Sequence, residues 1–327
     1  MQTMPEANVE TLETPPQATD ADRHVSATTK IIGSILGVFG VLGLLAVVVG
    51  SCSGVTLFAA AAQPPVTEHA TQTLALTGAG IPTITCHLAA GSLQILAGSN
   101  NQVGVDITKS VRDISQDQSR RDLATMKVNF TQQGNAITIT ETYQPSSGWG
   151  FLWQGSIQRE IDLVITVPAA ANLAITAAAA DTSITGIAGQ ITVDSSASRL
   201  ILHQVTLTGA SRLKASAGEM LIDGSMTPDA TLDLRDSAGS IDFDGALATH
   251  DAITVNASAG SVAMHLPLST AVHVDANVSA GGISVSGFPL AVRQDFGNAS
   301  VAGDTAPDPT NTITVHISAG SFTLAGT

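Results

Sequence analysis

The tripeptide Ser-Ala-Gly recurs at a constant spacing along the second half of the chain. Four copies lie 21 residues apart, at residues 216–218, 237–239, 258–260 and 279–281. A fixed period of this length is typical of a solenoid, in which each repeat forms one rung stacked on the previous rung. The spacing therefore favours an architecture of similar stacked units over a globular core.

Short runs of alternating apolar and polar residues flank each tripeptide. Ser240–Asp244 follows one copy, and Ile253–Val255 precedes another. Alternation with a period of two turns one set of side chains inward and the other toward water, which predicts strands rather than helices. We expect two strands and two bends per rung, with about seven rungs between Leu173 and Thr327 and a stack roughly 34 Å tall. The predicted fold is all-β, a β-solenoid of the parallel β-helix type with rungs of about 21 residues.

The glycine of each tripeptide is expected to form a structural turn. Glycine adopts backbone angles that residues with a Cβ avoid, and Ser and Ala are small enough to stack on their counterparts in the next rung. Ser318–Gly320 follows Ser279 by nearly two periods, beyond an expected irregular loop at 297–311. The serines have a structural role, because no base occurs at a matching spacing. The predicted structural turns are at Gly218, Gly239, Gly260, Gly281 and Gly320.

The charge of the chain is unevenly distributed. The net charge is −14, and residues 215–327 carry 12 acidic and two basic groups. A surface of this sign repels nucleic acid, so we exclude nucleic acid as a partner. Only 3% of the residues are aromatic, which suits the thin interior of a solenoid.

Residues 31–62 contain no charged residue. Ile31–Gly50 alone would span about 30 Å as a helix, which is the thickness of the hydrocarbon core of a bilayer. We therefore expect one transmembrane helix at 30–63, after a disordered tail at 1–29 that is rich in Pro, Thr and Glu. Arg23 and Lys30 precede the charge-free segment, and no Lys or Arg follows it until Lys109. This asymmetry predicts a single-pass protein of the cell membrane, with a cytoplasmic N-terminus and an extracytoplasmic C-terminal domain.

Two other interpretations of this apolar segment remain open. Val49–Cys52 resembles the lipobox of bacterial lipoproteins, so Cys52 could carry a lipid, although apolar sequence continues beyond it. A cleaved secretory signal would have a shorter apolar region and no long polar leader. No disulfide framework is expected from Cys52 and Cys86.

Residues 64–172 are predicted to form an irregular β cap that precedes the repeat solenoid at 173–327. Their strands alternate, and Gln133–Asn135 is expected to join two strands as a hairpin. The charged stretch 113–125 is expected to form one short helix. An open solenoid end exposes unpaired strand groups and needs a cover, which this segment would supply.

The order of these features resembles the bacterial family named "putative adhesin", a domain of unknown function (4097) also described as toastrack-like. The resemblance covers about residues 66–327 and rests on one ordered set of motifs: Gly91–Ile95, Val103–Ile107, the hairpin around Gly134, Ile165–Pro168 with Leu173–Ile175, and the repeated Ser-Ala-Gly turns. It implies a β-solenoid displayed at the cell envelope, in surface-associated or membrane-stress proteins. It implies no catalytic residues.

The acidic residues Asp223, Asp242 and Asp244 are weak candidates for binding calcium. Asp223 and Asp244 are one period apart and each precedes a glycine, so they should stack at one position of adjacent rungs. A hard cation could bridge such carboxylates. The alternative is a solvated outer face that keeps the strands soluble. No catalytic residue and no cofactor is predicted.

Both tryptophans of the chain lie in one short aromatic cluster. Trp149, Phe151 and Trp153 fall between Pro145 and Gly155. This loop could contact a partner or the outer leaflet of the membrane. Alternatively, it folds over the end of the solenoid as a hydrophobic lid.

The sequence favours a non-enzymatic, membrane-anchored surface protein, either an adhesin or an envelope-stress and interaction module. It would bind a protein or another cell-surface partner through its strand faces. One alternative is a carbohydrate-active β-helix enzyme, for which Arg199, Arg212 and Lys214 are the available basic groups, although they are expected to offset nearby acidic residues. A second alternative is a membrane-stress regulator that acts through its cytoplasmic tail.

Overall fold

The computed structural model describes residues 64–98, 101–113, 115–143 and 158–327. These residues belong to one compact unit, Ala60–Thr327. The expected tail at 1–29, the expected membrane helix at 30–63, Cys52 and the aromatic loop with Trp149, Phe151 and Trp153 lie outside the described residues. No helix within them has the length and apolar character needed to cross a membrane.

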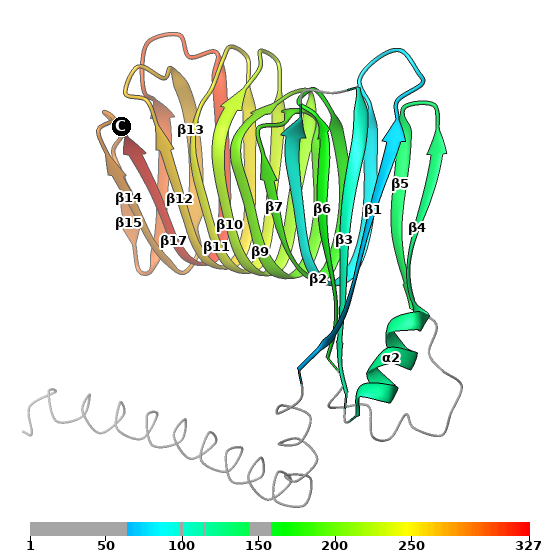
Figure 1. The fold of residues 1–327 in the computed structure, drawn as a ribbon. Coiled ribbons are helices and arrows are strands. Elements are labelled where there is room, and N and C mark those ends of the chain that lie inside the picture. Colours follow the sequence, from blue (N-terminus) through cyan, green and yellow to red (C-terminus); the bar gives the residue numbers. More distant parts are fainter. Residues whose placement is uncertain (1–63, 99–100, 114, 144–157) are drawn as a thin grey trace, which may run out of the picture. The chain divides into compact units, whose positions relative to one another are not determined.

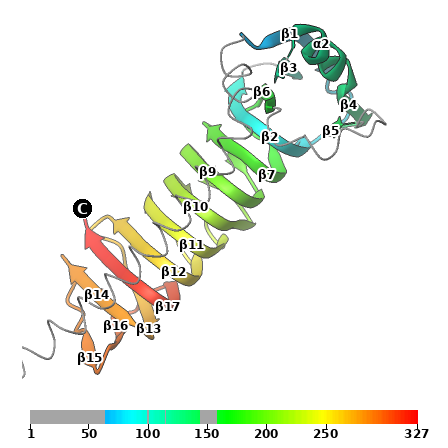
Figure 2. The same ribbon diagram turned by 90° about the horizontal axis from the view of Figure 1, so that it is seen from below.

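The described chain is almost entirely strand, and its long strands stack side by side in one parallel series (Figures 1 and 2). Each long strand bends once near its middle, so its two halves lie in two facing layers. We call the layer of halves before the bend face 1, and the layer of halves after the bend face 2. The long strands are β2 (Thr83–Gly98), β7 (Asn172–Thr185), β9 (Ile191–Leu207), β10 (Ala210–Met226), β11 (Thr231–Ala246), β12 (Ala252–Leu266) and β17 (Asn311–Gly326).

The bend coincides with the Ser-Ala-Gly tripeptide, as expected. Gly218 is paired with Gly239, and Gly239 with Gly260, which confirms the expected register of one period per rung across β10, β11 and β12. Gly218 and Gly260 have φ of +141° and +135°, a region that favours glycine. The expectation of two separate strands per rung is wrong, because each rung is one bent strand without a break, although the register of pairs between β10 and β11 skips Ser216 and Ala217 at the bend.

The last rungs do not follow the order of the sequence. Gly281 was expected to stack on Gly260, but β17 lies between them: Gly260 pairs with Gly320, and Gly320 pairs with Gly281. The chain therefore leaves β12, forms the end of the stack, and returns to insert its last strand one rung earlier. The end rung consists of two short strands, β13 (Val272–Val278) and β14 (Gly281–Ser286).

The prediction of an irregular loop at 297–311 is also partly wrong. It contains β16 (Asn298–Asp304), which pairs antiparallel with β13 and with β15 (Arg293–Asp295). These antiparallel strands extend face 1 beyond the end rung. The rungs between 172 and 327 are β7, β9, β10, β11, β12, β17 and the pair β13–β14, with the short β8 (Ala188–Gly189) in the turn before β9.

At the other end, two strands together form the rung next to β2. The first half of β2 pairs with β5 (Ala136–Tyr143), and the second half pairs with β6 (Gln158–Pro168). Antiparallel strands then extend both faces. The strand β4 (Met126–Gln133) pairs with β5 through the hairpin at Gly134, which confirms that prediction.

The strand β3 (Gln102–Arg112) pairs with β6, and β1 (Val66–Ala75) pairs with β3. The helix α2 (Gln116–Thr125) confirms the short helix expected in this segment. The Ser115 side chain caps it by accepting a hydrogen bond from the Gln118 amide at 3.2 Å.

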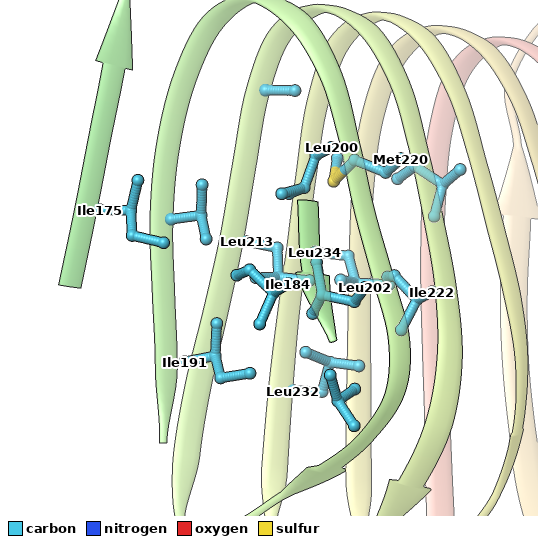
Figure 3. Close-up of a cluster of buried hydrophobic side chains, with 14 of the residues drawn as sticks. Ile175, Ile184, Ile191, Leu200, Leu202, Leu213, Met220, Ile222, Leu232 and Leu234 are labelled. Atoms are coloured by element: carbon cyan, nitrogen blue, oxygen red, sulfur yellow. The ribbon is translucent and has the colours of Figure 1, made fainter. Parts of the chain in front are cut away.

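The core fills the narrow space between the two faces. Inward side chains at equivalent positions of successive rungs form columns, such as Leu202 and Ile222 on face 2 (Figure 3). Phe243 continues this column in the next rung. Burying each such side chain stabilises the fold by about 1.5–3 kcal/mol. Cys86 of β2 belongs to this core as a free thiol, and burial, with a smaller effect of the Glu141 charge, raises its pKa to about 12. That pKa keeps the thiol protonated and unreactive at neutral pH.

Candidate functional site: an acidic hollow on face 2

The outer side of face 2 carries a hollow of about 400 Å³ across the middle rungs. Its apolar floor includes Ile201 and Leu221, which are half-buried although they point away from the core. Its rim is polar, half of the rim residues are acidic, and the rim reaches Thr327. The rim residues are His203, Asp223, Asp242, Asp244, His265 and Thr327.

Strand alternation places these side chains outside. Met220 and Ile222 of β10 are buried, so Leu221 and Asp223 between and after them point outward. Asp223 pairs with Asp244 of β11, which confirms the stacking expected from their spacing of one period. Asp242 lies two residues before Asp244, in the neighbouring column with Leu221.

Two histidines close the ends of this acidic column. His265 of β12 is paired with Asp244, and its Nε2 lies 3.7 Å from Oδ1 of Asp242. At the other end, Nδ1 of His203 lies 2.7 Å from Oδ2 of Asp223. A His–Asp–Asp–His column thus crosses four successive rungs. Sequence reasoning missed the histidines, although His265 follows Asp244 by the same period that separates Asp244 from Asp223.

His203 lies at an irregularity in the pairing of β9 with β10. The register shifts between Ile222 and Gly224, and Gln204 has a φ of +54°. The extra residue in β9 is a β-bulge, which re-aims the adjacent side chain. His203 faces Asp223 at the same spacing in the sequence that relates the preceding β9–β10 pairs, such as Leu202 and Ile222.

The arrangement does not amount to a formed metal site. Across the described ranges, no three or more His, Cys, Asp or Glu side chains lie close enough together to hold an ion. Calcium binding by Asp223, Asp242 and Asp244 therefore stays a prediction. As it stands, the rim offers carboxylate acceptors beside an apolar floor, which suits a ligand with a cationic group on an apolar stem.

The three basic residues considered for an enzyme do not form one cluster. Arg199 lies on face 2 and contacts Glu219 at 2.7 Å. Arg212 and Lys214 lie on face 1, at 3.0 Å from Asp233 and 3.1 Å from Asp194. Each basic group is paired with an acidic residue of an adjacent rung, which confirms the expected role of offsetting local charge.

A further acidic residue lies beneath the bend of β11. Asp236 is 5% exposed and occupies the inward column that holds Ala215 and Ala257 in the adjacent rungs. Burial raises the pKa of its carboxyl group, and hydrogen bonds from the Ala238 and Ser237 amides oppose this in part. Its Oδ1 atom is buried without a hydrogen-bond partner.

Several solved structures are similar to this chain, all at low sequence identity. One is "a putative cell adhesion protein" from Clostridium sporogenes ATCC 15579, with 12% identity, a TM-score of 0.38, and coverage of 81% of this chain and 100% of the other. Another is "a putative adhesin" from Bacteroides fragilis NCTC 9343, with 13% identity, a TM-score of 0.27, and coverage of 79% and 97%. A third is a "putative lipid binding protein" from Parabacteroides distasonis ATCC 8503, with 10% identity, a TM-score of 0.35, and coverage of 78% and 96%.

No curated protein matches the chain. The family model described as "Toastrack DUF4097" matches residues 94–325, which is well over half of the sequence. The family match agrees with the resemblance read from the Ser-Ala-Gly turns and the strands that precede them. The chain belongs to the Toastrack DUF4097 family.

Proposed function

We propose that this protein is a non-enzymatic binding module, held by a single-pass anchor in the cell membrane with its solenoid outside. The charge-free segment 31–62 supports the anchor, because it is long enough to cross a bilayer and precedes β1 by only a few residues. The basic residues before it support a cytoplasmic N-terminus.

The hollow on face 2 is the observation that carries the binding role. Its apolar floor is half-exposed where alternation would normally place polar side chains, since Ile201 and Leu221 occupy outward positions. Apolar groups in a concave surface with a few oriented polar groups are typical of binding sites. Three carboxylates on the rim favour a partner that presents Lys or Arg side chains.

The test uses the full chain on intact cells, with a photo-crosslinking residue in place of Leu221 in the hollow or Thr314 on face 1. Crosslinks are expected from position 221 and not from position 314. Asp223→Asn with Asp244→Asn should abolish them, whereas the control Asp275→Asn with Asp295→Asn should not. Equal crosslinking from both faces, or crosslinks that survive the first double substitution, would refute binding at this hollow.

The anchor is tested separately with epitopes at the two ends of the same chain. Protease added outside intact cells is expected to remove a C-terminal epitope after Thr327 and to spare an N-terminal one. Protection of both epitopes, or release of the intact chain by a carbonate wash, would show that the single-pass arrangement is wrong.

A further inference from the structure

Basic residues are concentrated in one short segment of an otherwise acidic unit. Residues 109–127 contain five Lys or Arg and three Asp, whereas the other described residues contain six Lys or Arg and 19 Asp or Glu. This segment comprises the end of β3, the helix α2 and the start of β4. The sign of the local charge is therefore opposite to that of the solenoid faces.

The helix turns its basic residues toward solvent. Arg120 and Arg121 are exposed on α2, and Lys127 is exposed directly after it. The acidic residues are less available, because Asp113 and Asp122 are buried and only Asp117 is exposed. The exposed surface of this segment is thus more basic than its composition indicates.

Asp122 is also neutralised by a residue from another strand. Its Oδ2 lies 2.9 Å from the guanidinium group of Arg159 in β6. The buried side chain of Leu123 fixes the same side of the helix against the core. With its inner side held in this way, α2 presents Asp117, Arg120 and Arg121 outward at helical spacing.

This basic surface lies where the described chain begins. The helix α2 packs against β3 and against β1, whose first residue, Val66, pairs with Val111 (Figure 1). Arg112 and Pro65 line the same small hollow, which also includes Glu160. From the end of the charge-free segment at residue 62 to Val66 the chain can extend only about 14 Å. An anchor at 31–62 therefore holds this part of the domain close to the bilayer surface.

We propose that Arg120, Arg121 and Lys127, which we call the α2 surface, bind the phosphates of anionic lipid headgroups in the membrane that holds the anchor. Cations beside a membrane span are attracted to anionic lipids within about one Debye length, which is roughly 8 Å at physiological salt. The acidic solenoid faces are repelled by the same headgroups. The two effects together orient the domain with α2 against the membrane. This inference rests on the proposed single-pass anchor.

The test is amide hydrogen exchange of the full chain reconstituted in vesicles. One set of vesicles contains phosphatidylcholine alone, and the other contains added phosphatidylglycerol. Peptides from α2 are expected to exchange more slowly in the anionic vesicles, and raising the salt concentration well above the physiological level should remove the difference. Arg120→Gln with Arg121→Gln should also remove it, while Lys214→Gln with Arg293→Gln, which deletes two positive charges elsewhere, should leave it intact.

Flotation of the same vesicles tests the single-pass anchor separately from the binding of anionic lipid by the α2 surface. If the chain does not float with either vesicle, the anchor itself is refuted. If the chain floats but α2 exchanges equally in both vesicles, the anchor stands and the α2 surface does not bind anionic lipid. A difference that survives the Arg120→Gln and Arg121→Gln substitutions would likewise overturn the assignment.

Discussion

Gly281 is paired with Gly320 of the final strand, although nearly two periods separate them in the sequence and Gly260 lies only one period away. The backbone oxygen of Gly320 occupies the space that a Cβ on Gly281 would need, and the oxygen of Gly260 does the same for Gly320. The bends of three rungs are therefore stacked too closely for any side chain at these positions. The insertion of β17 is possible because its own bend matches the bends on both sides.

This contact predicts that Gly320→Ala is severely destabilising. The new methyl group would overlap the backbone of β12, which cannot move without breaking its pairing with β17, so we expect a loss of about 4 kcal/mol or more. Gly209→Ala is the matched control, because Gly209 also has a positive φ of +59° but nothing lies within 4 Å of its Cβ position. The control should lose only about 1–2 kcal/mol. Urea unfolding followed by circular dichroism measures both, and equal losses would contradict the close stacking.

The sequence predicted the bent rungs well because the bend has a strict chemical requirement. A Cβ does not fit at Gly218, Gly239 or Gly260, so these positions record the register of β10, β11 and β12 directly, whereas Ser198 holds the same bend position in β9. The order of the last rungs cannot be predicted in this way, because β12, β14 and β17 all carry glycine at the bend. Phe322 of β17 lies between Val262 of β12 and Ile283 of β14 in a column of apolar side chains. Val262 and Ile283 could equally well pack directly on each other, so these residues do not indicate that β17 lies between them.

The same reasoning explains what could be predicted of the candidate site. Asp223 and Asp244 lie in an unbroken part of the repeat, so their spacing predicted that they stack. His203 lies at a β-bulge, and the period of the Ser-Ala-Gly copies misses it by one residue, because the preceding β9–β10 pairs are one residue closer in the sequence than the copies are. The hollow itself depends on the outward apolar residues Ile201 and Leu221. Both lie in runs of consecutive apolar residues, in which the alternation of apolar and polar residues does not show which side chains face the core and which face solvent.

Asp236 should make stability depend on pH. Burial raises the pKa of its carboxyl group above the ordinary value of 3.8, so the folded state favours the protonated form. Its stabilising effect is present below that ordinary value and is lost as the pH rises through the raised pKa. Asp236→Ala, which matches Ala215 and Ala257 in the column, is expected to be more stable than the natural protein by about 1 kcal/mol at pH 7.

The prediction for Asp236 is tested by measuring how the difference in stability between Asp236→Ala and the natural protein changes with pH. Denaturation at several pH values should show the advantage of Asp236→Ala shrinking as the pH falls through the raised pKa toward 3.8, and staying constant below that value. Asp236→Asn removes the charge and keeps an acceptor for the Ala238 amide, so its advantage should shrink in the same range. An Asp236→Ala protein that is less stable at every pH would show that the accepted hydrogen bonds outweigh the buried charge.

Arg159 should be needed to hold α2 in place. It pairs with the buried Asp122 at 2.9 Å and lies 4.4 Å from the centroid of the Tyr143 ring. Arg159→Ala leaves a buried carboxylate unpaired, which is expected to cost about 3–5 kcal/mol and to accelerate amide exchange in α2. Arg199→Ala breaks an exposed pair with Glu219 and should cost at most about 1 kcal/mol.

A double substitution separates the charge effect from lost packing at this position. Asp122→Leu with Arg159→Met removes both charges, so it should recover most of the stability lost in Arg159→Ala. If the double variant is as unstable as Arg159→Ala, the ion pair is not the reason that α2 stays docked on the strands.

We expect a substitution of Phe296, at the tip of the hairpin between β15 and β16, to raise the stability of the protein. Phe296 and Gly297 are its two central residues, with φ of +41° and +94°, and the flanking Asp295 and Asn298 are paired. Turns with two positive φ values favour Asn-Gly, and a bulky residue at the first position is strained. The Phe296 side chain is 105% exposed, so its removal sacrifices no packing. Phe296→Asn is therefore expected to raise stability by about 1 kcal/mol.

The β-branched substitution Phe296→Val provides the opposite control for this turn. Valine fits a positive φ less well than phenylalanine, so this variant should be less stable than the natural protein, and the two variants should move the urea midpoint in opposite directions. The turn also holds the end rung, since the Gly281 amide donates a hydrogen bond to the Gly297 oxygen at 2.9 Å. Amide exchange at Gly281 should therefore slow in Phe296→Asn and accelerate in Phe296→Val. If Phe296→Asn is no more stable than the natural protein, the backbone strain at this tip is too small to matter.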